Sequence, residues 1–315
     1  MTEPNHRDND RNDSDRIIKI ISGILIKTPV FNYLIANVTR CIDESPILRE
    51  PLCMLITGES GVGKSTIISA IEKKYPITIH EEYNEIPVLT AEIPNPVTIK
   101  ALYSELLIKL GAGYLDKGSV EERRSKLLRQ LQLCKVRLII LDEFQHLIER
   151  GTKNRIQAVA DAIKTLINKS RIPIILVGTP AAAPVLELSP QLSGRFPLRE
   201  HISSFNWIIR PNEFEKLLLH YEKALPFEMP SGFCDGWNPA RIYLATGGYF
   251  RVFTTLIREA ALIASKYESP RIELQHLAAS FDKVLRASRK LRGNPFSMED
   301  REIERWIATL REAQA

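Results

Sequence analysis

Residues 58–65 read GESGVGKS, which fits the phosphate-loop pattern G-x-x-x-x-G-K-[ST]. An apolar run, PLCMLIT at 51–57, precedes this loop, and a helical pattern, STIISAIEKKY at 65–75, follows it. A strand, a glycine-rich loop and a helix in this order direct backbone N–H groups and the positive end of the helix toward an anion. An ordinary glycine turn does not need that context, so we predict a nucleotide-binding site here.

The loop assigns a role to several of its residues. Lys64 is expected to reach the β and γ phosphates, Ser65 to ligate Mg²⁺ through its hydroxyl, and Thr66 to lie over the α phosphate. The cofactors expected are therefore ATP and Mg²⁺. The predicted nucleotide-binding residues are Gly58, Glu59, Ser60, Gly61, Val62, Gly63, Lys64, Ser65, Thr66 and, from a distant helix, Arg251.

Short apolar segments alternate with helical patterns through the first two thirds of the chain. This order predicts a parallel sheet covered by helices on both faces, the α/β class. The predicted strands cover 51–57, 85–94, 136–141 and 172–178, and the predicted helices between them cover 65–75, 98–111, 119–134 and 154–169.

The chain divides into four expected segments. Residues 1–15 are dense in Asp, Asn and Arg, which predicts a disordered tail, and 16–210 form the α/β nucleotide-binding domain. After about residue 211 only helical patterns occur, which predicts a smaller all-helical lid at 211–292. Residues 293–315 remain as a C-terminal tail.

The 315 residues carry a net charge of +5, which permits nucleic-acid binding without proving it. Four scattered cysteines form no C-x-x-C pair and indicate reduced thiols rather than a metal site. Neither a signal peptide nor an apolar run of membrane-spanning length is visible. We therefore expect a cytoplasmic protein that does not enter a membrane.

The stretch RLIILDEFQHL at 137–147 carries two carboxylates directly after an apolar run. Beside a phosphate loop, Asp142 is expected to hold Mg²⁺, and Glu143 to act as the base for an attacking water. The alternative is that both residues only mark the end of a strand. Gln145 and His146 either report the nucleotide state to a neighbouring surface or simply cap a helix or satisfy a loop.

Further polar side chains extend the predicted catalytic set. Thr179 follows the strand at 172–178 and could bind the γ phosphate or the water beside it. Arg195, with Arg199 as second candidate, could act on the nucleotide of a neighbouring subunit, unless each is a surface ion pair. Arg251 begins a long helix after Gly247 and Gly248 and could contact the γ phosphate of its own subunit.

These motifs resemble those of AAA+ ATPases. GESGVGKST, LIILDEFQHL, LVGTP, QLSGRF and GGYFR occur in the order of Walker A, Walker B, sensor 1, arginine finger and sensor 2. DEFQHL, IPVLTAEIPNPVTIKALYSELLIKLG and QLSGRF are more narrowly similar to the TniB/TnsC group of transposition regulators, some of which act in RNA-guided (CRISPR-associated) transposition.

The resemblance implies a bacterial, DNA-associated, ATP-dependent regulator of transposition. Members bind double-stranded DNA, assemble with themselves as rings or helical filaments, and link a target-selection protein of the TniQ/TnsD type to a DDE-type transposase. Candidate DNA contacts are Thr98, Lys100, Lys153 and Arg155, although exposed lysines are often plain surface residues. Alternatives are an initiator-like, helicase-loader-like or secretion-associated ATPase, and a non-enzymatic, nucleotide-gated scaffold.

Overall fold

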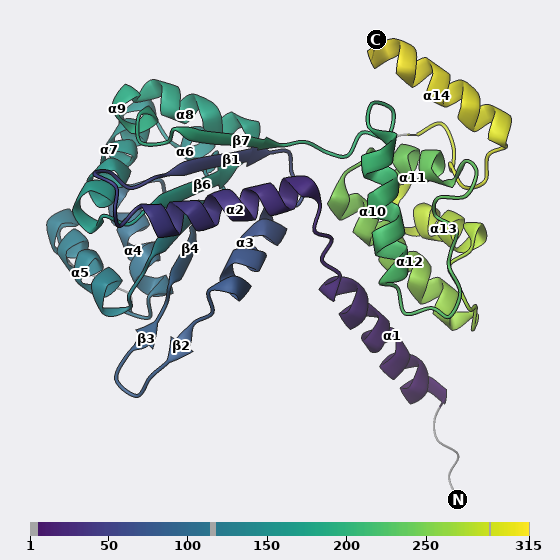
Figure 1. Ribbon diagram of the computed structural model, residues 1–315, viewed down its shortest axis with the longest axis horizontal. Helices are drawn as coiled ribbons and strands as arrows, with labels where there is room; N and C mark the ends of the chain where they lie inside the picture. Colours follow the sequence, from purple (N-terminus) through teal and green to yellow (C-terminus); the bar gives the residue numbers. More distant parts are fainter. Residues whose placement is uncertain (1–5, 114–117, 290, 315) are drawn as a thin grey trace, which may run out of the picture. The chain divides into compact units, whose positions relative to one another are not determined.

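The computed structural model describes residues 6–113, 118–289 and 291–314. The chain forms two compact units (Figure 1). An α/β unit comprises Pro29–Ser203, and a helical unit comprises Met1–Thr28 together with Ser204–Ala315. Among the described residues, every helix is too short or too polar to span a lipid bilayer.

The α/β unit is built on a five-stranded sheet with strand order β4-β5-β6-β1-β7. All neighbouring strands in this sheet pair in parallel. The parallel α/β fold class expected from the sequence is therefore confirmed. The strands are β1 (Met54–Gly58), β4 (Val88–Glu92), β5 (Leu138–Asp142), β6 (Ile174–Gly178) and β7 (Leu198–Ile202).

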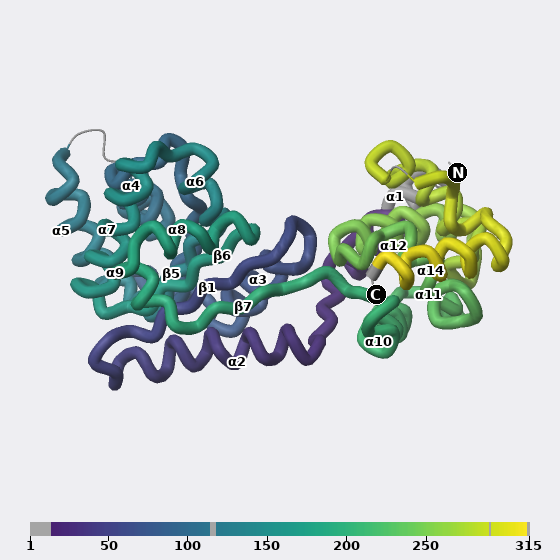
Figure 2. The backbone as a smooth tube through the Cα atoms, turned by 90° about the horizontal axis from the view of Figure 1, so that it is seen from above, coloured from purple at the N-terminus to yellow at the C-terminus, as the bar shows by residue number. Residues whose placement is uncertain are grey.

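Helices cover both faces of this sheet (Figure 2). The helices α4 (Ile99–Lys109), α5 (Val120–Leu133) and α7 (Lys153–Ser170) lie on one face. On the other face lie α2 (Pro29–Glu44) and α3 (Lys64–Lys74). Alternate strand residues point to opposite faces, so each strand supplies both layers of the core. The layer against α4, α5 and α7 includes Leu55, Leu89, Ile139, Leu141 and Leu176.

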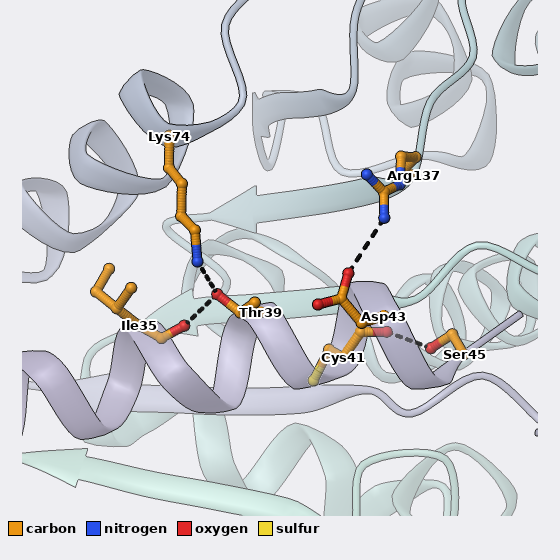
Figure 3. A network of polar contacts seen from close by, with 7 residues as sticks. All are labelled: Ile35, Thr39, Cys41, Asp43, Ser45, Lys74 and Arg137. Carbon is orange, nitrogen blue, oxygen red and sulfur yellow. Dashed lines mark hydrogen bonds and ion pairs between the residues drawn. The ribbon is translucent and has the colours of Figure 1, made fainter.

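Polar contacts at the ends of side chains link α2 to its neighbours (Figure 3). The ammonium of Lys74, at the end of α3, donates to Thr39 Oγ1 at 2.7 Å. The guanidinium of Arg137, just before β5, donates to Asp43 Oδ1 at 3.2 Å. These contacts are exposed, so each adds little energy. Helix α2 is held mainly by its buried residues Leu34, Val38, Cys41 and Ile42.

Two strand features were not predicted from the sequence. Strand β7 pairs with β1 at the edge of the sheet. Its charged sequence LREHI alternates between half-buried and exposed positions and ends at the buried Ile202. A small antiparallel hairpin, β2 (Thr78–Ile79) with β3 (Asn84–Glu85), follows α3. Neither segment carries the apolar run by which the buried strands are found, because an edge strand and a surface hairpin bury little side-chain area.

Short helices connect the strands near their carboxyl ends. Helix α6 (His146–Arg150) follows β5, and the 3₁₀ turn η1 (Pro180–Ala182) follows β6. The helices α8 (Ala183–Leu188) and α9 (Pro190–Ser193) then lead into β7. Because β5 and β6 pair in parallel, the segments that follow their ends begin side by side.

The helical unit packs around a second apolar core. Phe214, Tyr221, Phe253 and Phe281 are among its fully buried aromatic residues. Their rings meet edge to face, as Tyr221 and Phe253 do at 4.9 Å between centroids. The elements are α1 (His6–Gly23), α10 (Pro211–Lys223), α11 (Asn238–Thr246), α12 (Phe250–Lys266), α13 (Leu274–Ser280), the π-helical turn η2 (Phe281–Leu285) and α14 (Asp300–Gln314).

Both ends of the chain differ from the expected tails. Of the tail expected at 1–15, residues 1–5 lie outside the described residues, whereas 6–15 belong to α1. Ile17 and Ile21 bury the end of that helix in the core of the helical unit. Residues 300–314, expected within a C-terminal tail, form α14. Apolar residues at helical spacing, which the polar composition of both ends obscured, anchor these helices.

Candidate functional site

The phosphate loop follows β1 at the point where the order of the strands reverses. Strand β1 lies between β6 and β7, although β4 and β5 intervene between β1 and β6 in the sequence. Connections therefore leave β1 and its neighbour β6 in opposite directions. In open parallel sheets such a switch point opens a crevice at the carboxyl ends of the strands, where ligands bind.

The glycines of the loop meet two different needs. Gly61 and Gly63 have φ values of 85° and 112°, which side chains rarely tolerate. At Gly58 the need is space, because an added Cβ would lie 2.6 Å from Ile202 O and 2.9 Å from Val62 Cγ2. The loop is thus held close to β7 by its backbone, and only glycine fits its closest approach.

Helix α3 begins at Lys64, one residue before the predicted start. Its N-cap, Gly63, provides no side chain to accept a hydrogen bond from the first turn. The Gly63 carbonyl accepts from the N–H groups of Thr66 at 3.1 Å and Ile67 at 3.2 Å. The start of the helix is therefore a site at which an anion can replace a side-chain cap.

Lys64 curls back over the loop that precedes it. Its ammonium donates to Gly58 O at 2.7 Å and to Glu59 O at 3.0 Å. Ser65 is exposed, Thr66 is half-buried, and the exposed Glu59 and Ser60 form the outer part of the loop. The loop thus carries a fixed positive charge beside a helix N-terminus.

The two carboxylates lie at the carboxyl end of β5, as the sequence predicted. Asp142 is paired in register with Glu92 of β4, and its Oδ1 accepts from the Glu143 N–H at 2.8 Å. Burial raises the pKa of the Asp142 carboxyl, and the nearby charges of Glu143 and Glu92 act in the same direction. The hydrogen bond from the Glu143 N–H and the charge of Lys64 oppose this shift. A cation at this carboxylate would relieve that burial of charge.

Glu143 adopts a left-handed backbone conformation, with φ of 54°. This conformation is costly for a side chain and tends to occur at functional sites. The next residue fixes it, because the Phe144 N–H donates to Val177 O at 2.9 Å and the Phe144 ring is fully buried. The turn therefore projects the Glu143 carboxylate in one defined direction.

The side chain of Gln145 connects this turn to β6. Its Nε2 donates to Glu143 Oε2, and its Oε1 accepts from the Thr179 N–H at 3.0 Å. Thr179 precedes η1 but makes no side-chain capping bond there. The structure thus brings Glu143, Gln145 and Thr179 together. His146 points elsewhere, and its Nε2 lies 3.1 Å from Arg150 Nη2.

Both candidate arginine-finger residues have partners within the α/β unit. Arg195 Nη1 lies 2.6 Å from Glu50 Oε2, and its side chain is only 17% exposed. Arg199 donates to Ser193 Oγ at 2.6 Å and to Phe196 O at 3.3 Å. The pairing with Glu50 could not be predicted, since the two charges are far apart along the chain.

The candidate DNA-contacting residues lie at the beginnings of two helices. Thr98 is the N-cap of α4 and accepts from the Ala101 N–H at 3.1 Å, so part of its hydroxyl function is structural. Lys100 is exposed in the first turn of α4, and Lys153 and Arg155 are exposed in the first turn of α7. Both helices begin after the carboxyl ends of sheet strands, β4 and β5.

Arg251 lies in the helical unit, exposed in the first turn of α12. The preceding turn requires its glycines, since Gly247 and Gly248 have φ values of 63° and 73°. A Cβ at Gly248 would lie 1.7 Å from Phe205 O. The sharp turn expected from the paired glycines is present, and the role of Arg251 toward a nucleotide stays a prediction.

Several known proteins are similar to parts of this chain. The sequence profile of the family described as "Bacterial TniB protein" matches residues 16–206, more than half of the chain. ATP-binding subunit ClpL of Lactococcus lactis subsp. lactis is 25% identical over 115 residues, 36% of this chain and 13% of ClpL. Chaperone protein ClpB of Tropheryma whipplei is 26% identical over 143 residues, 45% of this chain and 18% of ClpB. The chain thus matches less than a fifth of either relative.

Solved structures share the fold at low sequence identity. CDC6P from Pyrobaculum aerophilum gives a TM-score of 0.62 at 16% identity, covering 85% of this chain and 71% of that chain. The Aeropyrum pernix ORC2 protein, in ADPNP–ADP complexes, gives 0.59 at 15% identity, covering 84% and 71%. The Aeropyrum pernix ORC1 protein in complex with DNA gives 0.56 at 16%, covering 84% and 67%. At these sequence identities, the likenesses show that the chain shares its fold with these proteins.

Proposed function

Because this chain belongs to the bacterial TniB family, we propose that it is an ATP-dependent, DNA-binding regulator of transposition. The observation that carries the proposal is the joint occurrence of this family match and a complete phosphate-loop site. That site combines the Gly58–Ser65 loop with two carboxylates at the end of β5. Neither feature alone distinguishes a transposition regulator from other AAA+ proteins.

We assign the nucleotide to the loop because its geometry fits phosphate. Gly58 leaves no room for a side chain, and the first turn of α3 lacks a side-chain cap. The Lys64 ammonium would donate to phosphate oxygens in place of the loop carbonyls, and Thr66 would lie near the α phosphate. Ser65 and Asp142 would hold Mg²⁺, which when bound supplies positive charge to the phosphates.

In the proposed hydrolysis, Glu143 accepts the proton of the attacking water. Its carboxylate stands next to Asp142, whose Oδ1 accepts from the Glu143 N–H. Asp142 would hold the metal, and Glu143 would be left to act on the water. Thr179, at the end of β6, would orient that water or the γ phosphate. These roles explain why the two adjacent carboxylates differ in backbone conformation and in hydrogen-bond partners.

Two arginines would complete the site when subunits assemble. Arg195 would act on the nucleotide of a neighbouring copy, which requires that it leave Glu50. Arg251 would contact the γ phosphate from the helical unit of the same chain. Assembly into a ring or helical filament on double-stranded DNA is thus part of the proposal, because it would bring Arg195 to a neighbour's site.

The proposed partners follow from the family. They are double-stranded DNA, further copies of this chain, a DDE-type transposase and a target-selection protein of the TniQ/TnsD type, in the bacterial cytoplasm. The net charge of +5 supports the DNA part, as do the exposed cations Lys100, Lys153 and Arg155. The Aeropyrum pernix ORC1 structure, which shares the fold, is a complex with DNA.

A DNA-binding experiment tests the proposal. The chain is mixed with a duplex of arbitrary sequence and a non-hydrolysable ATP analogue, and light scattering and electron microscopy follow assembly at 50 and 200 mM salt. We expect nucleotide-dependent oligomers on DNA that weaken at the higher salt. A monomer under all these conditions would contradict the proposal.

Paired charge removals locate the DNA contact. Lys100→Ala with Lys153→Ala should weaken DNA binding roughly tenfold or more through two lost phosphate contacts. The matched control is Lys109→Ala with Lys169→Ala, which removes exposed lysines from the opposite ends of the same helices. Equal losses from both pairs would place the contact elsewhere.

An initiator-like or helicase-loader-like role is the second candidate, favoured by the structural likeness to CDC6P and ORC proteins. The discriminating measurement is insertion of a donor element into target DNA by its transposase with and without this chain. Transposition that depends on the chain and on its ATP hydrolysis supports the first proposal. Transposition that is indifferent to the chain contradicts the first proposal and leaves the second candidate standing.

A further inference from the structure

Gln145 joins the ends of two neighbouring strands through both ends of its carboxamide. The NH₂ group donates to Glu143 Oε2 after β5, and the carbonyl accepts from the Thr179 N–H after β6 at 3.0 Å. The contact with Thr179 crosses 34 residues of sequence. A donor and an acceptor on one planar group are both required, and glutamine provides them.

Helix capping does not explain this side chain. Gln145 occupies the N-cap position of α6, yet its side chain makes no capping hydrogen bond. Its backbone carbonyl serves the helix, since it accepts from the Ile148 N–H at 3.0 Å and the Glu149 N–H at 3.1 Å. With only 4% of the residue exposed, the carboxamide is committed to Glu143 and Thr179.

The end of β6 is shaped around the same carboxamide. A Cβ on Gly178 would lie 2.6 Å from Gln145 Oε1 and 3.0 Å from Ala182 Cβ. Gly178 has no positive φ, so its glycine is needed for space and not for backbone conformation. The position before Thr179 therefore has no side chain, and Gln145 fills the room that this leaves.

The backbone alone does not fix the Glu143 carboxylate. The left-handed turn at φ of 54° and the buried Phe144 fix where the side chain leaves the chain. The glutamate side chain still has three rotatable bonds, which the turn does not restrain. The hydrogen bond from Gln145 to Oε2 restrains them and leaves Oε1 available to accept a proton.

We propose that Gln145 is a positioning residue for ATP hydrolysis, which orients the Glu143 carboxylate and couples it to the backbone of Thr179. This inference rests on the proposed role of Glu143 as the base. Donation by the Thr179 N–H polarises the amide and strengthens its bond to Glu143. A shift of the segment after β6, when Thr179 meets a nucleotide, is thereby transmitted to the base.

The first test is Gln145→Leu, which keeps similar bulk and removes both hydrogen bonds. We expect kcat for ATP to fall roughly 10- to 100-fold, since misplacing a catalytic group by about 1 Å costs that much. The affinity for a fluorescent ATP analogue should stay within about twofold, because Gln145 lies outside the phosphate loop. An unchanged kcat in a folded variant would overturn the proposal.

A matched control exists in the helical unit. Gln275 is exposed, and its Nε2 donates at 2.8 Å to Glu273 Oε2, a carboxylate two residues earlier, as Gln145 does to Glu143. Gln275→Leu should leave kcat and nucleotide affinity unchanged. An equal fall in kcat for both variants would mean that the effect of Gln145→Leu is not specific to the site.

The second test, Gln145→Glu, separates positioning from space filling and keeps the proposal testable if the leucine variant fails to fold. The introduced carboxyl group can still accept from the Thr179 N–H. When ionised it cannot donate to Glu143, and when protonated it can. We expect kcat relative to the wild type to be low at pH 8 and to rise toward pH 6. A ratio near one at every pH would show that only shape matters and would overturn the proposal.

The variant Glu143→Gln distinguishes an error in the assignment of the base from an error in the role of Gln145. If it leaves ATP turnover unchanged, the assignment of the base is wrong and the role of Gln145 falls with it. If it stops turnover while both Gln145 variants behave like Gln275→Leu, only the role of Gln145 is wrong. If both are right, combining Glu143→Gln with Gln145→Leu lowers kcat little further than Glu143→Gln alone.

Discussion

The phosphate loop and the turn after β5 achieve unusual backbone conformations in opposite ways. In the loop, Gly61 and Gly63 take positive φ values because they lack side chains. In the turn, Glu143 takes φ of 54° with a full side chain, fixed by the burial of Phe144 and its bond to Val177 O. The comparison shows that local sequence determines the loop, whereas tertiary contacts determine the turn.

Removal of the loop's charge should have the largest effect. Lys64→Ala should abolish binding of a fluorescent ATP analogue at micromolar concentration, a loss of at least about 100-fold, because charge-assisted phosphate contacts disappear. Titration by fluorescence anisotropy measures this. Lys73→Ala, which removes an exposed lysine from the same helix, is the control and should bind normally. If Lys64→Ala still binds the nucleotide, the phosphate loop is not the nucleotide-binding site.

Removal of the base should affect turnover but not binding. Glu143→Gln should lower kcat roughly 100- to 10,000-fold, the usual contribution of a general base, with nucleotide affinity preserved. Oligomers on DNA should last longer, since the nucleotide that holds them is not consumed. Phosphate release and single-particle lifetimes are the measurements. Normal ATP hydrolysis by Glu143→Gln would contradict the view that the loop binds the nucleotide and the turn after β5 supplies the base.

A glycine-to-alanine change sharpens the conformational contrast. Gly63→Ala places a side chain at φ of 112°, which should lower the free energy of unfolding by about 1–2 kcal/mol. An added Cβ there meets no atom within 4 Å, so the cost is conformational and not steric. Glu143→Gly should relieve the backbone strain but leave the buried Gln145 NH₂ group without its acceptor, so its loss of stability should be smaller than that of Gly63→Ala. Urea denaturation of both variants tests this, and parallel losses would refute the contrast.

The smallest effect concerns the pH dependence of stability. Because burial raises the folded-state pKa of Asp142, the folded protein binds that proton more tightly than the unfolded chain, whose ordinary value is 3.8. Its contribution to stability therefore falls as pH rises from 3.8 through the folded-state pKa. Asp142→Asn should raise the Tm of the nucleotide-free protein by roughly 2 °C at pH 7.5.

This gain should shrink as the pH is lowered toward the ordinary value of 3.8, where the wild-type carboxyl is also protonated. The same variant should lose most of the added stability that Mg²⁺ and ATP give the wild type. A constant gain at all pH values would show that burial of charge at Asp142 does not limit stability.

The sequence predicted those parts of the fold that a run of neighbouring residues determines. The buried strands β1, β5 and β6 and the loop at Gly58–Ser65 each carry a continuous signal of apolar residues or glycines. Strand β7 was missed because its LREHI sequence satisfies only an edge position. Its place in the sheet depends on pairing with β1, about 140 residues away.

The residues of the site were predictable from local sequence, but their long-range contacts were not. Asp142 and Glu143 could be found because they end an apolar run after a phosphate loop. The partners of Gln145 and Arg195 could not, since Thr179 and Glu50 reach them only through the fold. Bulk composition obscured the ends of the chain, where a few apolar residues in α1 and α14 direct each helix.

Helix α14 has a practical consequence for shortening this protein. Ile303 and Ile307 cover Ala240 and Leu244 of α11. The buried Arg241 donates to Pro295 O, to Met298 O at 2.8 Å and to Asp300 Oδ1 at 2.7 Å. Truncation after residue 292 would expose the apolar surface of α11. It would also leave the buried guanidinium of Arg241 without these acceptors. A protein shortened by residues 293–315 would therefore be prone to aggregate. An affinity tag should be added after α14 and should not replace it.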